Sequence, residues 1–507
     1  MNQTLQINGF LHLLSDVCIS KNSDFINNDK IIIDKNMKAF LNFQNKEYEN
    51  FVGSSIFYTQ SPLSVAVGMT IAQNIFAERF NKQEMALVYH NIFCIVSDLA
   101  TGENFDALRM AIDCKLKNLI VVYKSADARL INFYKKYGVN VAESFDELLN
   151  LSNISNMPTF ISIESFVGAE DICDIEMKKC IHSCLVGGSG REKIYKNVCN
   201  AYKKKYSNEF KLFQNFYQLK SINLDSEDNF KGLALGNFAL NKLSNDTLCL
   251  LGGSAVRSNN IYLIGGGDYP YNPIGVNINF EDYVDIMYDV LAGISMYDKF
   301  FVFCNDKVSN MTKLFGVKDS FKGVILLHED VPYLHSWFDK RLNVFRPSNA
   351  SEMAFAFNQS IQNNLANIIL LTDDFLGGKV AKDQSLECGG YEITNCSKPN
   401  GIILASGKDV LFAKAVRNIL SLKGIDIAIF SIFDHKLFKE NHHKCLDKYK
   451  NIKSIVAFAC EGDTNFDRYV CQTGAVIDIR HQNPEGLAKK IYAIIKRNGE
   501  RSDSLFD

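Results

Sequence analysis

The sequence predicts an α/β protein of three serial domains with mostly parallel sheets. Short apolar runs rich in Val, Ile and Phe recur along the whole chain, and helix-length segments separate them. Continuous apolar runs of this kind are typical of parallel strands that helices cover on both faces. The chain has 507 residues, which is too long for a single hydrophobic core and predicts several domains of ordinary size.

Each predicted strand is an apolar run bounded by polar or helix-like sequence. The runs lie at residues 92–96, 118–123, 160–163, 300–303, 324–327, 368–371, 401–406, 427–432 and 454–459. Two stretches turn polar and rich in Gly, Lys or Asn, at 187–209 and 382–401, and such composition favours a break between domains. The predicted domains are therefore 1–185, 210–380 and 395–507.

The balanced charge argues against nucleic acid or an anionic membrane as a partner. Apolar residues make up 47% of the chain, charged residues 22%, and the formal net charge is -2. This profile is typical of a soluble globular protein without a long-range field that would attract polyanions. The amino terminus has no basic lead-in, and no run approaches the roughly 18 apolar residues of a membrane span. We therefore expect a cytoplasmic protein.

The fourteen cysteines show no paired spacing, which predicts reduced thiols packed as small hydrophobic side chains. Cys173, Cys180, His182 and Cys184 together offer ligands that zinc accepts. The last three alternate, however, as on one face of a strand, instead of forming short paired hooks. The spacing therefore favours packing over metal binding.

Several segments are similar to transketolase sequences and occur in the order of that family. They are SPLSVAVGMTIAQNIFAERFN at 61–81, LCLLGGSAVRSNN at 248–260, RPSNASEMAFAF at 346–357, ASGKDVLFAKAVRNIL at 405–420, SIFDHKLFKEN at 431–441 and GAVIDI at 474–479. Ser61 and Pro62 also suit the N-cap and first turn of a helix. The resemblance implies a transketolase-like fold with a diphosphate-binding first domain, a pyrimidine-binding second domain and a C-terminal third domain.

The resemblance also implies a cofactor and a dimer. Thiamine diphosphate with Mg would bind between the first domain of one subunit and the second domain of the other, which implies a homodimer. The cofactor would do the carbanion chemistry, while the protein supplies a metal-anchored diphosphate site, an activating acid and donors for a sugar phosphate.

The diphosphate loop of the family, Gly-Asp-Gly, is similar to Ser97, Asp98 and Leu99 in this chain. Glycines there let backbone amides approach the diphosphate, so we expect the Leu99 side chain to obstruct it. The family's asparagine metal ligand falls on Ala126, with Asp127 one residue later. Asp98 and Asp127 are either a displaced metal pair or solvated loop carboxylates.

Thiamine activation in the family depends on a glutamate that hydrogen-bonds the aminopyrimidine ring. The gap-free match, at 279–293, places Val284 at that position, and valine cannot donate a proton. Glu281 lies nearby, but positions displaced along a helix face other directions. The resemblance also assigns Phe300 and Phe301 to cofactor binding.

The sugar-phosphate site of the family is retained only in part. Arg346, Glu329 and Asp330 match family positions, and the resemblance assigns them to substrate binding. His335 lies one place from the family's histidine and is a candidate catalytic residue. Aspartates in LLTDDF replace a later arginine of the family, and losing that positive charge weakens a sugar-phosphate site.

Three functions remain open. The first is a transketolase-like protein of pentose phosphate ancestry that is catalytically inactive or impaired and persists as a homodimer or beside an active paralogue. The second is an active transketolase that moves a two-carbon ketol unit between sugar phosphates, with Asp98, Asp127 and Glu281 as rearranged ligands and acid. The third binds another phosphorylated metabolite or a protein partner. Losses at the diphosphate loop, the activating acid and the sugar-phosphate donors together favour the first.

Overall fold

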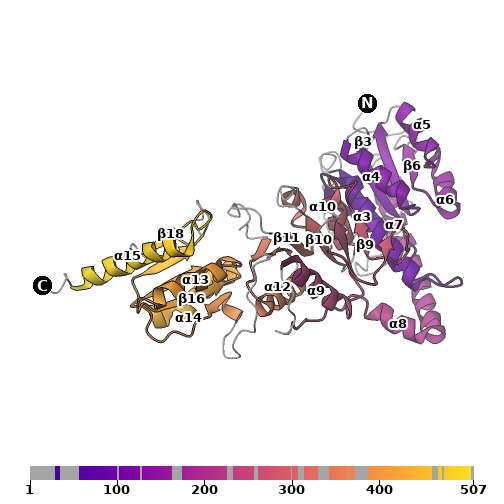
Figure 1. Cartoon of the computed structure of the whole chain (residues 1–507). Coiled ribbons are helices and arrows are strands. Elements are labelled where there is room, and N and C mark those ends of the chain that lie inside the picture. Colours follow the sequence, from indigo (N-terminus) through magenta and orange to yellow (C-terminus); the bar gives the residue numbers. More distant parts are fainter. Residues whose placement is uncertain are drawn as a thin grey trace.

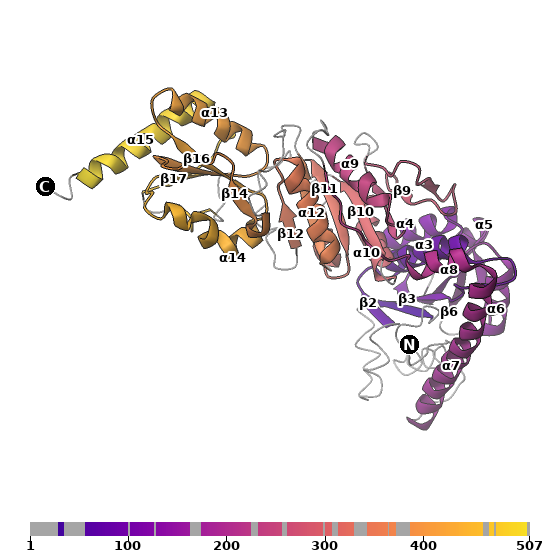
Figure 2. The same cartoon turned by 90° about the horizontal axis from the view of Figure 1, so that it is seen from below.

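The computed structural model arranges the chain as three α/β units that follow one another in sequence and in space (Figure 1). It describes residues 29–34, 56–99, 102–125, 128–162, 174–224, 232–255, 261–297, 300–306, 313–328, 342–363, 365–371, 386–459, 466–470 and 473–503. In both Figure 1 and Figure 2 the third unit lies at one end of the molecule, and the second unit separates it from the first. The predicted α/β class with mostly parallel sheets is confirmed.

The first sheet has six parallel strands in the order β2-β1-β3-β4-β6-β5. The strands are β1 (Lys30–Asp34), β2 (Ile56–Thr59), β3 (Ile92–Asp98), β4 (Leu119–Ser125), β5 (Asn140–Ala142) and β6 (Thr159–Ser162). The helices are α3 (Pro62–Phe80), α4 (Gly102–Asp113), α5 (Ala128–Lys136) and α6 (Phe145–Ile154). Successive residues of β1, Ile31, Ile32 and Ile33, are all fully buried, as expected for a strand covered on both faces.

The second sheet has seven strands in the order β12-β13-β11-β10-β7-β9-β8, and all neighbours are parallel. The strands are β7 (Leu250–Ser254), β8 (Asp268–Tyr269), β9 (Asn277–Asn279), β10 (Phe301–Asp306), β11 (Gly323–His328), β12 (Leu342–Phe345) and β13 (Ala366–Leu371). The helices are α9 (Gly232–Ser244), α10 (Met287–Met296), α11 (Leu314–Val317) and α12 (Ala350–Gln362).

The third sheet has five strands in the order β14-β16-β15-β17-β18, and only β14 pairs antiparallel. The strands are β14 (Gly390–Glu392), β15 (Gly401–Ala405), β16 (Ile427–Ile432), β17 (Ile455–Phe458) and β18 (Ala475–Ile477). The helices are α13 (Asp409–Ser421), α14 (His435–Leu446) and α15 (Pro484–Asp503), with short turns η6 (Leu386–Cys388) and η7 (Asp447–Tyr449).

A long helix, α7 (Asp174–Lys205), connects the first two units and is followed by α8 (Ser207–Gln214). The stretch at 187–209, expected to mark a break between domains, is thus mostly helical, and the domain bounds 1–185, 210–380 and 395–507 stay predictions. Glycines lower helix stability by about 1 kcal/mol each, but they do not forbid a helix. Tyr195, Val198 and Tyr202 recur at helical spacing and pack on the core, which outweighs that cost.

Three of the four residues weighed for zinc lie on this helix, whereas Cys173 lies outside the described residues. Cys180, His182 and Cys184 belong to α7, so the expected strand-like alternation is wrong. Residues two apart do not share a face of a helix. Within the described part of the chain, no group of three His, Cys, Asp or Glu residues is placed to hold a metal ion.

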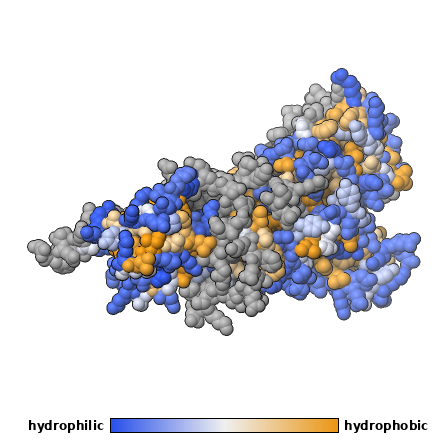
Figure 3. Space-filling model, viewed as in Figure 1, coloured by the Kyte–Doolittle hydropathy of each residue, from blue (hydrophilic) through white to orange (hydrophobic). Residues whose placement is uncertain are grey.

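The described surface is mixed in polarity. On the face shown in Figure 3, hydrophobic residues form small groups among hydrophilic ones. Within the described ranges, no helix combines the length and the apolar character needed to span a membrane.

Two glycines bring α3 of the first domain and α10 of the second domain into close contact (Figure 1). A Cβ atom on Gly68 would lie 1.9 Å from the carbonyl oxygen of Val290, and one on Gly293 would lie 2.1 Å from that of Val65. The contact is reciprocal, so each helix supplies one glycine and one carbonyl. Only glycine allows the two backbones to approach this closely.

An aromatic cluster supports the same junction. Phe76 of α3 packs on Phe213 of α8 at 5.3 Å and on Phe216 at 4.7 Å between ring centroids. Phe300, directly before β10, packs on Phe216 at 5.4 Å and on Phe76 at 6.4 Å. The connecting helices and the second sheet are thus joined to the first domain by apolar packing.

The second and third domains are joined by buried polar groups. The Arg346 guanidinium lies 3.3 Å from the Asp409 carboxylate, and the Arg346 amide donates to the Phe433 carbonyl. Glu352, fully buried near the start of α12, accepts a hydrogen bond of 2.7 Å from the Ser431 hydroxyl on β16. Burial raises the pKa of Glu352, while its hydrogen bonds oppose that rise.

Candidate functional site

The candidate site lies where the first and second domains meet, beside the end of β3. Three helices begin there: Ser61 precedes α3, Glu103 lies in the first turn of α4, and Asp289 lies in the first turn of α10. Asp289 interacts with both of the other side chains. Ligands of open α/β sheets bind beside the carboxyl ends of strands, so this edge is where a site is expected.

Asp289 is a partly buried carboxyl group to which the Ser61 hydroxyl donates a hydrogen bond. Ser61 occupies the predicted N-cap position and Pro62 begins α3, but the Ser61 side chain makes no capping bond to that helix. Burial raises the pKa of Asp289 to about 7 and Glu103 adds to the rise, whereas Ser61 and Lys313 oppose it. The Asp289 carboxyl therefore exchanges its proton near neutral pH.

Carboxyl groups outnumber cations at this edge. Lys313 forms an ion pair with the exposed Asp285, and Glu103 and Asp289 lie close by. Helix N-termini attract anions, but Glu103 already takes the favourable position in the first turn of α4. The described side chains at this edge therefore disfavour a diphosphate.

The turn after β3 differs from the sequence-based expectation. Leu99 is fully buried and belongs to the hydrophobic core, so its side chain does not project into solvent as an obstruction. The structure gives only the backbone of Asp98, as the last residue of β3, and Ala126 and Asp127 lie outside the described residues. The metal pair of Asp98 and Asp127 stays a prediction.

Val284 lies in a turn before α10 and not within a helix. Within the matched segment 279–293 the helix begins only at Met287, because the chain first pairs through β9 and then turns. Val284 is half-buried and packs against the core. Glu281 is exposed, and its amide donates to the Asn279 side chain at 2.9 Å.

The two phenylalanines assigned to cofactor binding lie at the amino end of β10. Phe300 is buried in the aromatic cluster at the domain junction, and Phe301 begins the strand and is 4% exposed. Ligands are expected at the other end of a parallel strand. Their cofactor role stays a prediction that their position does not support.

The residues assigned to substrate binding are not brought together within the described chain. Arg346 directs its guanidinium at Asp409 of the third domain, so its charge serves the junction between domains. Glu329, Asp330 and His335 lie outside the described residues. The substrate and catalytic roles of these residues stay predictions.

Sequence reasoning missed two buried polar residues at the carboxyl end of β10. Asn305 is 0% exposed, and neither the nitrogen nor the oxygen of its side-chain amide has a hydrogen-bond partner among the described residues. Asp306 is 1% exposed and interacts with the Tyr288 hydroxyl. The signal was present as two polar residues that follow the apolar run at 300–303 after a single cysteine, Cys304.

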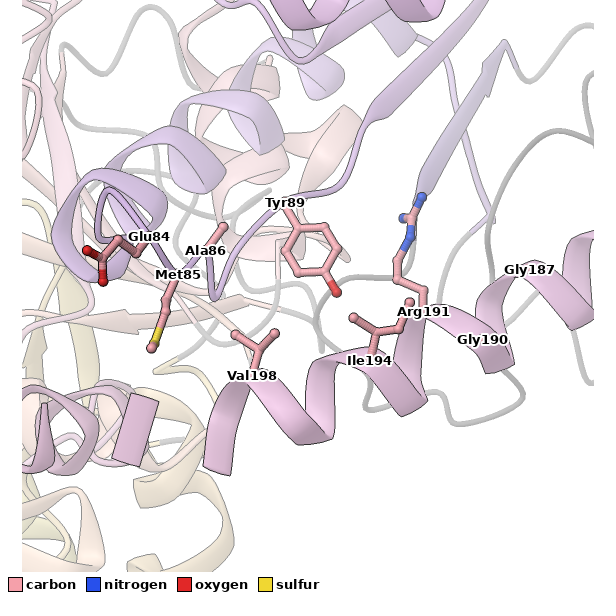
Figure 4. Close-up of a pocket in the computed structure, with 9 residues that line it drawn as sticks. All are labelled: Glu84, Met85, Ala86, Tyr89, Gly187, Gly190, Arg191, Ile194 and Val198. Atoms are coloured by element: carbon pink, nitrogen blue, oxygen red, sulfur yellow. The ribbon is translucent and has the colours of Figure 1, made fainter. Parts of the chain in front are cut away.

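A cavity of about 590 Å³ lies away from this edge, between α7 and the loop that follows α3 (Figure 4). Its walls are mainly apolar, with Met85 and Tyr89 on one side and Ile194 and Val198 on the other. Arg191 lies at one end of the cavity and pairs with the buried Asp29 carboxylate at 2.8 Å. No residue predicted for cofactor or substrate binding lines this cavity.

Three α/β units, with the first and second meeting at helix N-termini beside parallel strands, are the arrangement found in transketolase structures. Residues 54–133 match the family model described as "Transketolase, thiamine diphosphate binding domain". The chain is similar to the transketolase of Aquifex aeolicus, with 22% identity over 82% of this chain and 73% of that protein. It is also 22% identical to the transketolase of Streptococcus pyogenes serotype M6, over 82% of this chain and 69% of that protein.

Solved structures agree on the fold. The structure of Pichia stipitis transketolase in complex with sedoheptulose 7-phosphate is similar with a TM-score of 0.81 and 16% identity, over 98% of this chain and 97% of that chain. Transketolase from Leishmania mexicana is similar with a TM-score of 0.75 and 16% identity, over 99% and 97% of the two chains. The chain is therefore similar to transketolases along most of its length in sequence and in fold, and residues 54–133 match the family's thiamine diphosphate-binding domain.

Proposed function

We propose that the chain is a transketolase-family protein without ordinary ketol transfer, which persists in the cytoplasm as a homodimer or beside an active paralogue. The observation that carries the proposal is Val284. This half-buried, apolar residue stands where the resemblance places the activating acid. A side chain without a dissociable proton cannot take part in the proton transfer that activates the cofactor.

The described residues fit thiamine diphosphate poorly. When bound with Mg, this cofactor supplies the carbanion chemistry of its family. Here the helix N-termini that would receive its diphosphate are flanked by Asp289, Glu103 and Asp285, with Lys313 the cation among the described side chains at that edge. Like charges at close range oppose binding of such an anion.

Calorimetry tests the proposal on the purified full chain. We expect no saturable heat when thiamine diphosphate and magnesium chloride are titrated together to about 1 mM, well above the micromolar range of a functional site. Val284→Glu alone should not create binding, because the carboxyl groups of Asp289, Glu103 and Asp285 remain beside the helix N-termini. A micromolar affinity that depends on magnesium would overturn the proposal.

An active enzyme is the second candidate, and one observation favours it. A pKa of about 7 suits Asp289 to proton transfer at neutral pH. Asp98 and Asp127 would then serve as the metal pair, with Asp289 or Glu281 as the acid. Turnover of xylulose 5-phosphate with ribose 5-phosphate that is lost in Asp289→Asn would support this candidate. Absence of product at high enzyme concentration would remove it.

A further inference from the structure

A second cavity, here called the α4–α5 pocket, opens on the surface of the first domain and has a volume of about 300 Å³. Its lining comes from Phe105, Arg109 and Asp113 of α4, from Phe133 and Tyr134 of α5, and from Tyr137, which directly follows α5. The pocket lies between two helix faces and not at the helix N-termini. It is therefore separate from the candidate site described above.

Aromatic rings form most of the wall. The ring centroids of Phe133 and Tyr137 are 4.8 Å apart, and those of Phe105 and Phe133 are 6.2 Å apart. Three of the rings are exposed: Phe105 by 41%, Phe133 by 39% and Tyr137 by 56%. Single exposed apolar residues are ordinary, but a contiguous group around a cavity indicates a binding surface.

Tyr134 lines the pocket with a side chain that is almost fully buried. It is 2% exposed, its ring packs on Phe160 at 5.6 Å, and its hydroxyl is shielded, with no hydrogen-bond partner among the described residues. Because the hydroxyl is shielded, Tyr134 offers a ligand its ring and not a hydrogen-bond donor.

The charged side chains of the pocket are balanced. Arg109 and Asp113 lie 4.0 Å apart and are 51% and 56% exposed at their side chains. One offers hydrogen-bond donors and the other offers acceptors, and their charges cancel. This combination suits an uncharged ligand that carries both donors and acceptors on its edge.

We propose that the α4–α5 pocket binds a planar, uncharged aromatic heterocycle of the nucleobase kind. Aromatic side chains stack on any base, because every base has a π-face, and the guanidinium of Arg109 can also stack. The cavity is at the lower end of the range for small-molecule sites, which suits one bicyclic ring system. The exposed side chains of Arg109 and Asp113 would hydrogen-bond the edge of the ring.

A ligand in the α4–α5 pocket would also affect a contact between the first two domains. The Tyr283 hydroxyl of the second domain donates to Asp113, and the Arg109 guanidinium lies 5.5 Å from the centre of the Tyr283 ring. Val284 follows Tyr283 in the chain. A ligand that engages Asp113 competes with Tyr283 and loosens this contact.

Saturation-transfer NMR and calorimetry on the full chain test the proposal with adenine, adenosine and guanosine as probes. We expect saturable binding by at least one of them with a dissociation constant on the order of 0.1 to 1 mM. Tyr134→Phe keeps the ring and removes only the shielded hydroxyl, so it should leave binding within about twofold of the wild type. Phe133→Leu should weaken it about tenfold or more. Tyr271→Leu, a 94% exposed aromatic residue of the second domain, is the matched control and should leave binding unchanged.

Two results would overturn the proposal. The first is no saturable binding of any probe, or binding that Phe133→Leu leaves at the wild-type level. The second concerns a second copy of the chain as the occupant. If Phe133→Leu converts a dimer to monomers in analytical ultracentrifugation and no probe binds the wild type, the aromatic surface is a contact between copies.

Discussion

Gly293→Ala perturbs the junction between the first two domains with a single methyl group. The added Cβ would lie 2.1 Å from the Val65 carbonyl oxygen, whereas ordinary van der Waals contact begins near 3.4 Å. The clashing atom belongs to the backbone of α3, so no side-chain rotation can relieve it. The helices must separate by roughly 1.3 Å, or one of them must bend.

The size of the effect follows from what α10 buries. Met287, Val290, Leu291 and Ile294 are at most 1% exposed and pack across this junction. A gap of about 0.5 to 1 Å already forfeits a quarter to a half of the dispersion energy of such contacts. We therefore expect the free energy of unfolding to fall by about 3 kcal/mol or more, at the upper end of overpacking effects.

Urea unfolding followed by circular dichroism measures this loss, with Gly190→Ala as the matched control. Gly190 lies inside α7, and a Cβ there would meet no atom within 4 Å. Alanine should therefore stabilise that helix by about 1 kcal/mol. If Gly293→Ala were as stable as the wild type while Gly190→Ala behaved as expected, the close approach of α3 and α10 would be refuted.

Two further predictions concern buried carboxyl groups. Folding raises the pKa of Asp289 from 3.8 to about 7, chiefly by burial, so the free energy of unfolding falls as pH rises between these values. In urea titrations, the free energy of unfolding of Asp289→Asn should exceed that of the wild type by up to about 4 kcal/mol near pH 8 and by little near pH 4. An equal difference at both pH values would contradict this prediction. Glu352→Ala removes the carboxylate that accepts from the Ser348 amide and the Ser431 hydroxyl. It should lower the free energy of unfolding by about 3 kcal/mol in the same assay. Glu485→Ala, exposed in the first turn of α15, should change stability by less than about 1 kcal/mol, and equal effects of the two would refute the role of Glu352.

The strands were predictable because burial on both faces leaves a direct mark on the sequence. The apolar runs at 92–96, 324–327 and 427–432 fall within β3, β11 and β16. The helix α7 was not predicted, because its GGSG stretch and lysines have the composition of a linker. Its packing face, with Tyr195 and Tyr202, is visible only as helical spacing across polar sequence.

The candidate site was less predictable because its contacts join distant parts of the chain. Ser61 and Asp289 are far apart in sequence, and no sequence pattern around either residue predicts their hydrogen bond. The resemblance places Leu99 at a glycine position of the family, but sequence alone could not show that its side chain turns into the core. A resemblance supplies positions, whereas the direction of each side chain depends on packing.

The residues that hold the domains together and those that would hold a cofactor impose different physical demands. Gly68 and Gly293 must remain small because two backbones meet there, and Glu352 must remain because buried donors depend on it. Each of these requirements acts on stability and is met in this chain. Val284 satisfies packing equally well without any proton to transfer, and Asp289 adds negative charge at the edge where a diphosphate would lie. Because stability depends on the first set of residues and not on the second, this fold can persist whether or not the second set meets the demands of the chemistry.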